Sequence, residues 1–445
     1  MNKIIKYFLI IINLYCVILL FIYSKILYMN YIKTSNIKIS YNNIVNENDE
    51  YLIKVKYNNP KTKLYCSIDN KNWININDCN IKLKKGNYTV YVKNNYMTIN
   101  KEYKVVEKYE GTIKSNIDML DEYYLALNGN KKIELKFDYP EDFDTGYKWT
   151  IENKDIIKIE NDTIYGLKAG KTNITVKLND GNKKTFKIIV TDLITPPHIN
   201  ENKQTLSCNK YTEVENELLD KILASRVKEA GEGTRGGVIA AARFLTLEFP
   251  YNISYFAENG RLKNHGIQST IDGEGRFYHK GLYLSSLKYK DLKSNASTLT
   301  GPKPWGCSLY SIPMQIYQAN GLDCSGFVTW AMYNGGFDVG DVGAGDYKEL
   351  NDELSDLGAH NKITFDFMKN GKYKVGDYIA KNGHAALIIG IDDNNIYTAE
   401  SLGKGLRAKT YERYNGIVYT PILDYIIDMD NIYPNGEGNY QIMWN

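Results

Sequence analysis

Two residues lying far apart in this 445-residue sequence could together perform nucleophilic chemistry, a cysteine and a histidine. Cys324 lies in the stretch GLDCSGFVTWAM, whose apolar spacing predicts a helix that begins at or near the cysteine and ends at Gly335 and Gly336. At a helix amino terminus the macrodipole and free backbone N–H groups stabilise a thiolate. The position therefore predicts a cysteine with a lowered pKa and a nucleophilic sulfur.

The histidine opens an apolar strand, and a second strand follows it. His384 begins the stretch HAALIIG, and residues 395–400 form the next alternating run. A base on one strand, oriented by a polar group on the next, is the arrangement that activates a cysteine nucleophile. Glu400 is the favoured orienting group, because a carboxylate could hold the histidine tautomer. Thr398 is the alternative, since a two-residue shift of register would exchange them.

These stretches resemble the NlpC/P60 family of papain-like cysteine peptidases. The resemblance rests on DCSGFV, on the later V-G-D-Y, on GHAALIIG and on their order, between about residues 300 and 410. It implies an α+β papain-like domain in which Cys324 is the nucleophile and His384 the general base. Family members commonly carry His at the third position, where this sequence offers Glu400.

The resemblance also implies a substrate site. Trp305, in Pro-Trp-Gly, corresponds to an aromatic segment that helps shape the substrate cleft. Asp323 and Ser325 match the motif as residues lining the site, and we expect them to position the helix start rather than perform chemistry. The other histidines carry no motif: His360 lies nearest in sequence, and we expect His198, His265 and His279 at the surface.

The implied activity is cleavage of peptidoglycan stem peptides at the γ-D-glutamyl–diamino acid bond, with no cofactor. An amidase of the N-acetylmuramoyl-L-alanine type is an alternative, because related thiol hydrolases share the order of cysteine and histidine. A non-catalytic surface adhesin or scaffold is a further alternative from another class. Residues 252–300 lie outside the resemblance, and their sequence indicates no ligand.

The amino terminus predicts export. Lys3 and Lys6 precede an apolar run over residues 7–24, which Lys25 closes. This run nearly spans a bilayer core, and no small-residue cleavage site stands in the right place. We expect a membrane anchor with the rest of the chain on the extracellular, cell-wall side, and a cleaved signal with a secreted product as the alternative.

Cysteine usage limits the possible sites. Five cysteines follow Cys16, so at least one thiol outside the apolar run stays unpaired. Cys66 and Cys79 could form a disulfide within one domain, although sequence alone establishes no pairing. The chain has no CxxC pair and no His/Cys cluster with zinc-ligand spacing, so we expect no metal site.

Composition divides the chain into two kinds of domain. No arginine precedes Arg226, and only two alanines precede Ala224, which predicts a β-rich first half and a mixed second half. We therefore expect immunoglobulin-like sandwiches followed by the α+β domain. The predicted ranges are an apolar segment at 1–35, a divergent sandwich at 36–110, a second sandwich at 111–193, a linker at 194–210 and the hydrolase domain at 211–445.

The second sandwich resembles the bacterial immunoglobulin-like group 2 (BIG2) domain. The resemblance lies in a Trp-containing strand, a turn with glycines at 166 and 170, and the alternating strand that follows. In the next domain a capping box of Thr212 and Glu215 predicts a helix that ends at Gly231, and a second helix is predicted over residues 235–248. With 55 Lys+Arg against 52 Asp+Glu, the net charge of +3 argues against a nucleic-acid binder.

Overall fold

The computed structural model describes the greater part of the chain and groups it into two compact units. The described residues are 2–35, 38–42, 51–56, 63–75, 80–84, 86–93, 98–105, 111–118, 120–140, 145–257, 262–263, 280–288, 293–294, 303–311, 314–339, 358–381, 383–414, 417–418 and 424–439. Unit 1 comprises Met1–Lys114, Lys136–Thr150 and Thr175–Lys184. Unit 2 comprises Ser115–Leu135, Ile151–Ile174 and Thr185–Asn445.

Unit 1 begins with one long apolar helix, α1 (Asn2–Ser35). Its central segment, Tyr7–Tyr28, has a mean hydropathy of 2.3 and is not buried by the rest of the chain. Twenty-two residues at 1.5 Å each are long enough to cross the hydrocarbon core of a bilayer. A signal sequence has the same properties, so both sequence-based interpretations of this segment stay open.

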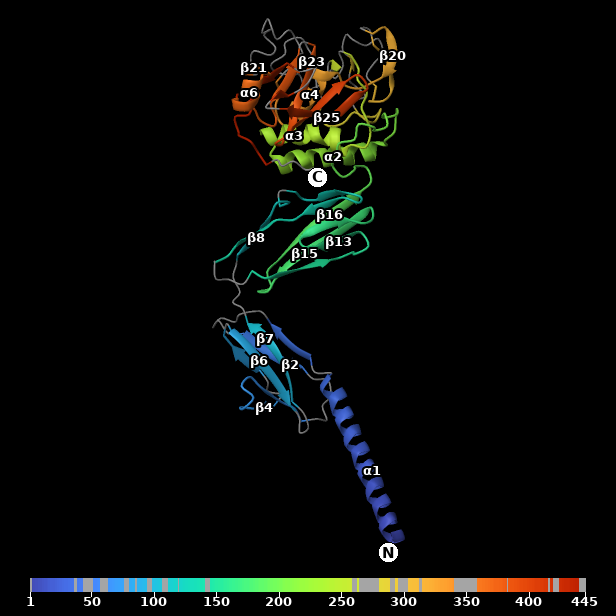
Figure 1. The fold of residues 1–445 in the computed structure, drawn as a ribbon, viewed down its shortest axis with the longest axis vertical. Helices are drawn as coiled ribbons and strands as arrows, with labels where there is room; N and C mark the ends of the chain where they lie inside the picture. Colours follow the sequence, from blue (N-terminus) through green and yellow to red (C-terminus); the bar gives the residue numbers. More distant parts are fainter. Residues whose placement is uncertain are drawn as a thin grey trace. The chain divides into compact units, whose positions relative to one another are not determined.

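The first β-rich region contains two antiparallel sheets (Figure 1). One sheet has the order β1-β2-β5 and the other β4-β3-β6-β7. Their bounds are β1 (Lys38–Asn42), β2 (Tyr51–Lys56), β3 (Tyr65–Ser67), β4 (Ile74–Asn75), β5 (Asn80–Leu83), β6 (Gly86–Lys93) and β7 (Thr98–Val105). Val90 and Val92 are fully buried while Tyr91 between them is half-buried, as a strand with one core-facing side requires. The predicted sandwich strands are confirmed here.

The described residues of the second β-rich region form nine strands, some of which belong to unit 1 and some to unit 2. They are β8 (Thr112–Ser115), β9 (Tyr123–Ala126), β10 (Asn130–Lys132), β11 (Leu135–Asp138), β12 (Tyr147–Ile151), β13 (Ile157–Glu160), β14 (Thr163–Gly166), β15 (Gly170–Leu178) and β16 (Lys183–Thr191). One sheet has the order β10-β14-β13 and another the order β12-β15-β16-β9. Asn161 and Asp162 join β13 to β14 with φ of 48° and 60°, the left-handed conformation that a two-residue hairpin turn needs.

Two helices and a π-helical turn begin the carboxy-terminal part of unit 2. Helix α2 (Glu213–Ala230) starts with the predicted capping box of Thr212 and Glu215 and stops at Gly231, whose φ is 104°. Helix α3 (Arg235–Arg243) continues into the π-helix η2 (Phe244–Glu248). Both predicted helices are therefore confirmed, except that the last turn of the second is wider than an α-helix.

A seven-stranded antiparallel sheet forms the rest of this part, with the order β21-β27-β22-β23-β24-β25-β26. Its strands are β21 (His360–Lys362), β22 (Tyr378–Lys381), β23 (His384–Ile391), β24 (Asn395–Leu402), β25 (Gly405–Tyr414), β26 (Ile417–Val418) and β27 (Tyr425–Ile427). The remaining elements are β17 (Leu262–Lys263), β18 (Lys293–Ser294), β19 (Ser308–Ser311), β20 (Ile316–Ala319), α4 (Cys324–Asn334) and α6 (Phe365–Asn370).

Helices α3 and α4 pack against strand β23 of this sheet (Figure 1). The three share one apolar core, in which Val238, Phe327 and Leu387 are buried. An antiparallel sheet with helices packed on it agrees with the mixed second half that composition predicts. The sheet and helices do not by themselves establish the papain-like fold that we expected for this domain.

Candidate active site

Cys324 is the first residue of helix α4, as its motif predicts. Asp323 precedes the helix in an extended conformation, and its Oδ1 accepts a hydrogen bond from the backbone N–H of Gly326 at 2.5 Å. The Ser325 hydroxyl donates to the same oxygen at 3.4 Å. Asp323 therefore satisfies one of the free donors of the helix and fixes where it begins. Asp323 and Ser325 thus lie at the helix start beside Cys324, and the expected substrate contact of these two residues stays a prediction.

The sulfur of Cys324 lies against both neighbours of His384. The thiol donates to the carbonyl of Gly383 at 4.0 Å, and the backbone N–H of Ala385 is directed at the sulfur. The N–H groups of Cys324 and Ser325 also face it. Since the residues on either side of the histidine touch the sulfur, the fold brings the start of α4, which carries Cys324, against the start of β23, which carries His384.

The free protein does not hold Cys324 as a thiolate. Burial raises the pKa of the thiol to about 11, and the charge of Asp323 acts in the same direction. The N–H groups of Ala385, Ser325 and Cys324 lower the pKa, but by less. The predicted lowered pKa is thus wrong for this state, because the loss of hydration outweighs the stabilisation that a helix end offers.

His384 has one ring nitrogen engaged and one available. Its Nε2 lies 3.0 Å from Oε2 of Glu400. Within the described part of the chain, Nδ1 is buried and has no hydrogen-bond partner. An ionised carboxylate only accepts, so Nε2 carries the ring proton and Nδ1 keeps its lone pair. Nδ1 is therefore the nitrogen that can take up a proton.

Strand register selects Glu400 rather than Thr398 as the partner of this histidine. Ala386 pairs with Glu400, and Ile388 pairs with Thr398. Because side chains two residues apart share a face, Glu400 is the diagonal neighbour of His384, whereas Thr398 lies two residues farther along. Among the described residues, the buried hydroxyl of Thr398 has no partner.

Two further residues at this site were missed by sequence reasoning. Arg407 donates from Nε to Oε1 of Glu400 at 2.8 Å, and the Tyr411 hydroxyl lies 3.3 Å from Oε2. Burial acts to raise the pKa of Glu400, but the hydrogen bond from His384 and the charge of Arg407 outweigh it and hold the pKa below its usual value. The sequence Gly403-Lys404-Gly405 could have predicted Arg407, because a hairpin turn there pairs Glu400 with Arg407 on the next strand.

Trp305 lies inside the core and does not line a cleft. Its side chain is 2% exposed and its ring centroid lies 6.2 Å from that of Trp330. A disulfide between Cys208 and Cys307 holds the segment that follows it. We therefore correct the expected substrate contact of Trp305 to a packing role.

Among the described residues, the other cysteines and histidines lie outside helix α4 and strand β23. Cys66 is disulfide-bonded, and Cys79 lies outside the described residues, as do His265, His279 and most of residues 252–300. The described free thiols are Cys16 and Cys324. His198 is exposed, as expected, and His360 lies on β21, three strands from β23.

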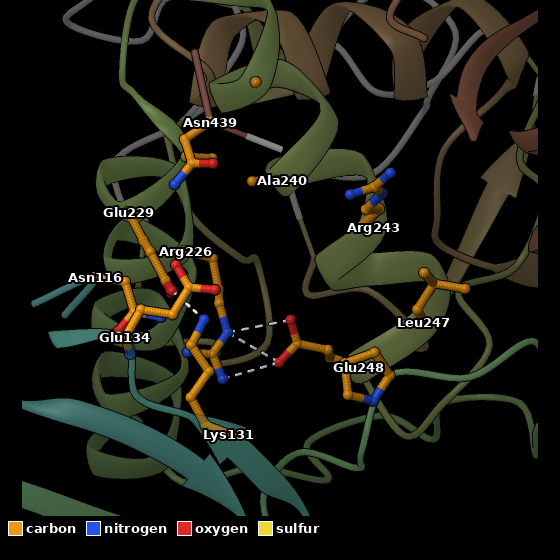
Figure 2. A pocket seen from close by; sticks show the side chains of 13 residues that line it. Asn116, Lys131, Glu134, Arg226, Glu229, Ala240, Arg243, Leu247, Glu248 and Asn439 are labelled. Carbon is orange, nitrogen blue, oxygen red and sulfur yellow. Dashed lines mark hydrogen bonds and ion pairs between the residues drawn. The ribbon is translucent and has the colours of Figure 1, made fainter. Parts of the chain in front are cut away.

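A separate cavity of about 120 Å³ lies within unit 2 and carries paired charges rather than a nucleophile (Figure 2). Arg226 is bonded to Glu248 at 3.0 Å, and Lys131 forms an ion pair with Glu229. Its lining residues are Asn116, Lys131, Glu134, Pro197, Arg226, Glu229, Ala230, Gly236, Ala240, Arg243, Leu247, Glu248 and Asn439. Because these charged side chains pair with one another, we interpret the cavity as structural and assign no catalytic or binding role to it.

One group of carboxylates could be mistaken for a metal site. Asp377, Asp428 and Asp430 place oxygens within 4.8 Å of one another. Arg235, fully buried, donates to Asp377 at 2.7 Å and to Asp430, and Lys374 also pairs with Asp430. Asp377 and Asp430 are thus already paired with cations, and we assign no metal ion to the group.

The family model that matches the chain is the hyaluronate lyase N-terminal β-sheet domain, over residues 143–189. The match lies in the second β-rich region. The BIG2 assignment of that region is therefore wrong. No curated protein matches the sequence significantly.

Solved structures with similarity to the chain include an S-layer protein, an intimin fragment and fibronectin(III)-like modules. Domains 4 and 5 of the S-layer protein SbsC have a TM-score of 0.15 and 16% identity, over 32% of this chain and 82% of that one. The intimin fragment in complex with its receptor domain has a TM-score of 0.20 and 14% identity, over 42% and 78%. The fibronectin(III)-like modules of Clostridium thermocellum CbhA have a TM-score of 0.19 and 12% identity, over 35% and 94%. Similarities this low carry no argument about function.

The NlpC/P60 assignment is also wrong. The family model that matches is that of a β-sheet domain, and the comparisons give the NlpC/P60 assignment no support. The motifs that suggested it specify local structure instead. Asp323 caps a helix, and HAALIIG forms a buried strand. Such features recur wherever a helix start meets a sheet, so the site around Cys324 rests on its own geometry.

Proposed function

We propose that the carboxy-terminal part of the chain is a thiol hydrolase that cleaves amide bonds, with Cys324 as nucleophile and His384 as general base. One observation carries this proposal. Nε2 of His384 is bonded to the buried Glu400, Nδ1 has no hydrogen-bond partner among the described residues, and the thiol of Cys324 contacts the residues before and after the histidine. Together these groups form a nucleophile, a base and an orienting carboxylate.

The reaction starts from a protonated thiol. Because the thiol is protonated in the free protein, Nδ1 of His384 takes its proton as the sulfur attacks the amide carbonyl. Backbone N–H groups at the start of α4 can stabilise the negative charge on the carbonyl oxygen. The imidazolium then protonates the leaving amine as the C–N bond breaks, and water, deprotonated by the same nitrogen, hydrolyses the thioester.

The proposed substrate is the stem peptide of peptidoglycan, cleaved at the γ-D-glutamyl–diamino acid bond. Export supports this choice, since α1 has the length and hydropathy of an anchor or a signal. In this proposal the chain works on the cell-wall side of the membrane, held by α1 or secreted if the segment is cleaved. The β-sandwich modules act as spacers, and neither nucleic acid nor a cofactor takes part.

Digestion of purified peptidoglycan tests the proposal. Wild type should release new stem-peptide fragments, and Cys324→Ala should release none. Cys16→Ser is the matched control, because Cys16 is the other free thiol among the described residues and should leave release unchanged. Equal release by wild type and Cys324→Ala would disprove the proposed nucleophile.

Product masses distinguish the two enzymatic alternatives. An endopeptidase leaves amino acids attached to the muramyl group, whereas an amidase frees its lactyl carboxylate. Mass spectrometry of the soluble fragments therefore identifies the bond that is cut.

A non-catalytic scaffold is the second candidate function, and the burial and raised pKa of Cys324 favour it. Cys324 is 5% exposed and its pKa is raised to about 11, as in a structural cysteine. A scaffold would bind peptidoglycan in a sedimentation assay without releasing fragments, and Cys324→Ala would bind as well as wild type.

A further inference from the structure

Among the described residues Arg407 pairs with Glu400 rather than with the thiol or the imidazole, and Glu400 orients the imidazole. We propose that Arg407 is a positioning residue, whose ion pair with Glu400 keeps that carboxylate ionised and thereby holds His384 in the tautomer that can accept the thiol proton. This inference rests on the proposed thiol hydrolase function and adds a residue to it.

The carboxylate of Glu400 divides its two oxygens between these partners. Oε1 accepts from Nε and Nη2 of Arg407, both at 2.8 Å, and Oε2 lies 3.0 Å from Nε2 of His384. The Tyr411 hydroxyl lies 3.4 Å and 3.3 Å from the two oxygens. The two guanidinium nitrogens thus hold one oxygen of the carboxylate, which leaves the other oxygen to hold the imidazole.

Burial makes the charge of Arg407 necessary. Glu400 is fully buried, and a carboxylate without a cationic partner in such a place tends to take up a proton. A protonated Glu400 could donate to Nε2 of His384, which would move the ring proton to Nδ1. In that tautomer Nδ1 could not accept the proton of Cys324, so the charge of Arg407 selects the active form.

The chain supplies a matched control on the same strand. Lys409 lies two residues after Arg407 on β25, its side chain is likewise 34% exposed, and it forms a 3.3 Å ion pair with Glu201. The side chain of Glu201 is 53% exposed and takes no part in the site. Lys409→Gln therefore removes a cation of similar exposure without touching Glu400.

Steady-state kinetics of the full chain on soluble muropeptides test the inference. Arg407→Gln should lower kcat about tenfold with little change in KM, since the lost group orients the base and does not bind substrate. Because Glu400 would then protonate at a higher pH, the acid limb of the kcat profile should move up by about one pH unit. Arg407→Lys should restore most of the acid limb, and Lys409→Gln should match wild type.

A double variant separates positioning from a merely structural role. If Arg407 acts through Glu400, adding Arg407→Gln to Glu400→Gln should change kcat by less than about twofold, whereas independent effects would multiply. An unchanged pH profile in Arg407→Gln, or multiplied losses in the double variant, would overturn the inference. If Arg407→Gln does not fold, Arg407→Lys provides the test. This variant keeps the positive charge, so a shift of about one pH unit in the acid limb of its kcat profile would overturn the inference.

The outcome also separates this inference from the function on which it rests. Wild type that releases no more product than Cys324→Ala contradicts the hydrolase itself. Active wild type with an unaltered Arg407→Gln contradicts only the role of Arg407.

Discussion

At the scale of single residues, the site combines a protonated thiol with an imidazole whose tautomer is fixed. Burial keeps the proton on Cys324, and the ionised Glu400 keeps the proton of His384 on Nε2. The thiol is thus protonated before substrate arrives, and Nε2 of His384 donates to Glu400. This differs from a preformed thiolate–imidazolium pair and has a measurable consequence.

Alkylation of Cys324 should be slow at neutral pH and rise with pH. The thiolate is the reactive form, and a thiol with a pKa of about 11 holds about a hundredfold less thiolate at pH 8 than one of ordinary pKa near 9. The rate with iodoacetamide should be followed by mass spectrometry on the peptide that carries Cys324, because Cys16 is also free. A fast rate that is flat between about pH 6 and pH 8 would indicate a preformed thiolate instead.

Glu400 and Thr398 should differ sharply in their effect on activity. Glu400→Gln removes the charge that fixes the histidine tautomer and should lower kcat by about a hundredfold. Thr398→Val replaces a buried hydroxyl that has no partner among the described residues and should leave kcat within about twofold. Assays of both variants on one muropeptide decide between them, and the reverse order of effects would contradict the register of β23 and β24.

At the scale of secondary-structure elements, local sequence patterns predict the individual helices and strands, whereas long-range strand pairing and packing determine which side chains meet at the site. The capping box of Thr212 and Glu215, the helix at Cys324 and the strand at His384 follow from spacing of a few residues. The choice of Glu400 over Thr398 depends on how β24 pairs with β23, and the burial of Trp305 depends on packing against Trp330. The raised pKa of Cys324 likewise results from tertiary burial, which spacing along the chain does not specify.

The start of helix α4 should matter for activity more than a comparable helix start elsewhere. Asp323→Ala removes the side chain that caps α4 and should cost about 1 kcal/mol of stability and reduce kcat, because the sulfur and the N–H groups move with the helix end. Thr364→Ala removes the equivalent cap of α6 and should cost similar stability without loss of kcat. Chemical denaturation and kinetics on both variants check this, and equal losses of kcat would contradict it.

The disulfide between Cys208 and Cys307 should stabilise the carboxy-terminal part substantially. It joins residues 99 apart and ties the segment before α2 to the segment that carries Trp305. Closing a loop of about 100 residues is worth up to about 4.7 kcal/mol on the chain-entropy account, so the double variant Cys208→Ser/Cys307→Ser should unfold at a lower denaturant concentration. Cys16→Ser is the control, and a double variant with an unchanged midpoint would show that the disulfide contributes nothing.

At the scale of the whole molecule, the chain joins an apolar helix, β-sandwich modules and an antiparallel sheet with helices packed on it. With 55 basic against 52 acidic residues, the protein carries little net charge to draw it to an anionic polymer. In the proposed function, tethering by α1 rather than bulk attraction keeps the enzyme close to the wall.

Release of amino groups from peptidoglycan tests the central claim most directly, because each cleaved amide bond yields one new amine. Purified peptidoglycan is incubated at neutral pH with wild type, Cys324→Ala, His384→Ala or Cys16→Ser, and the new amines are labelled and counted. The account predicts release by wild type and Cys16→Ser, and background levels with Cys324→Ala and His384→Ala. Release that is the same with Cys324→Ala as with wild type, or no release by wild type, would contradict it.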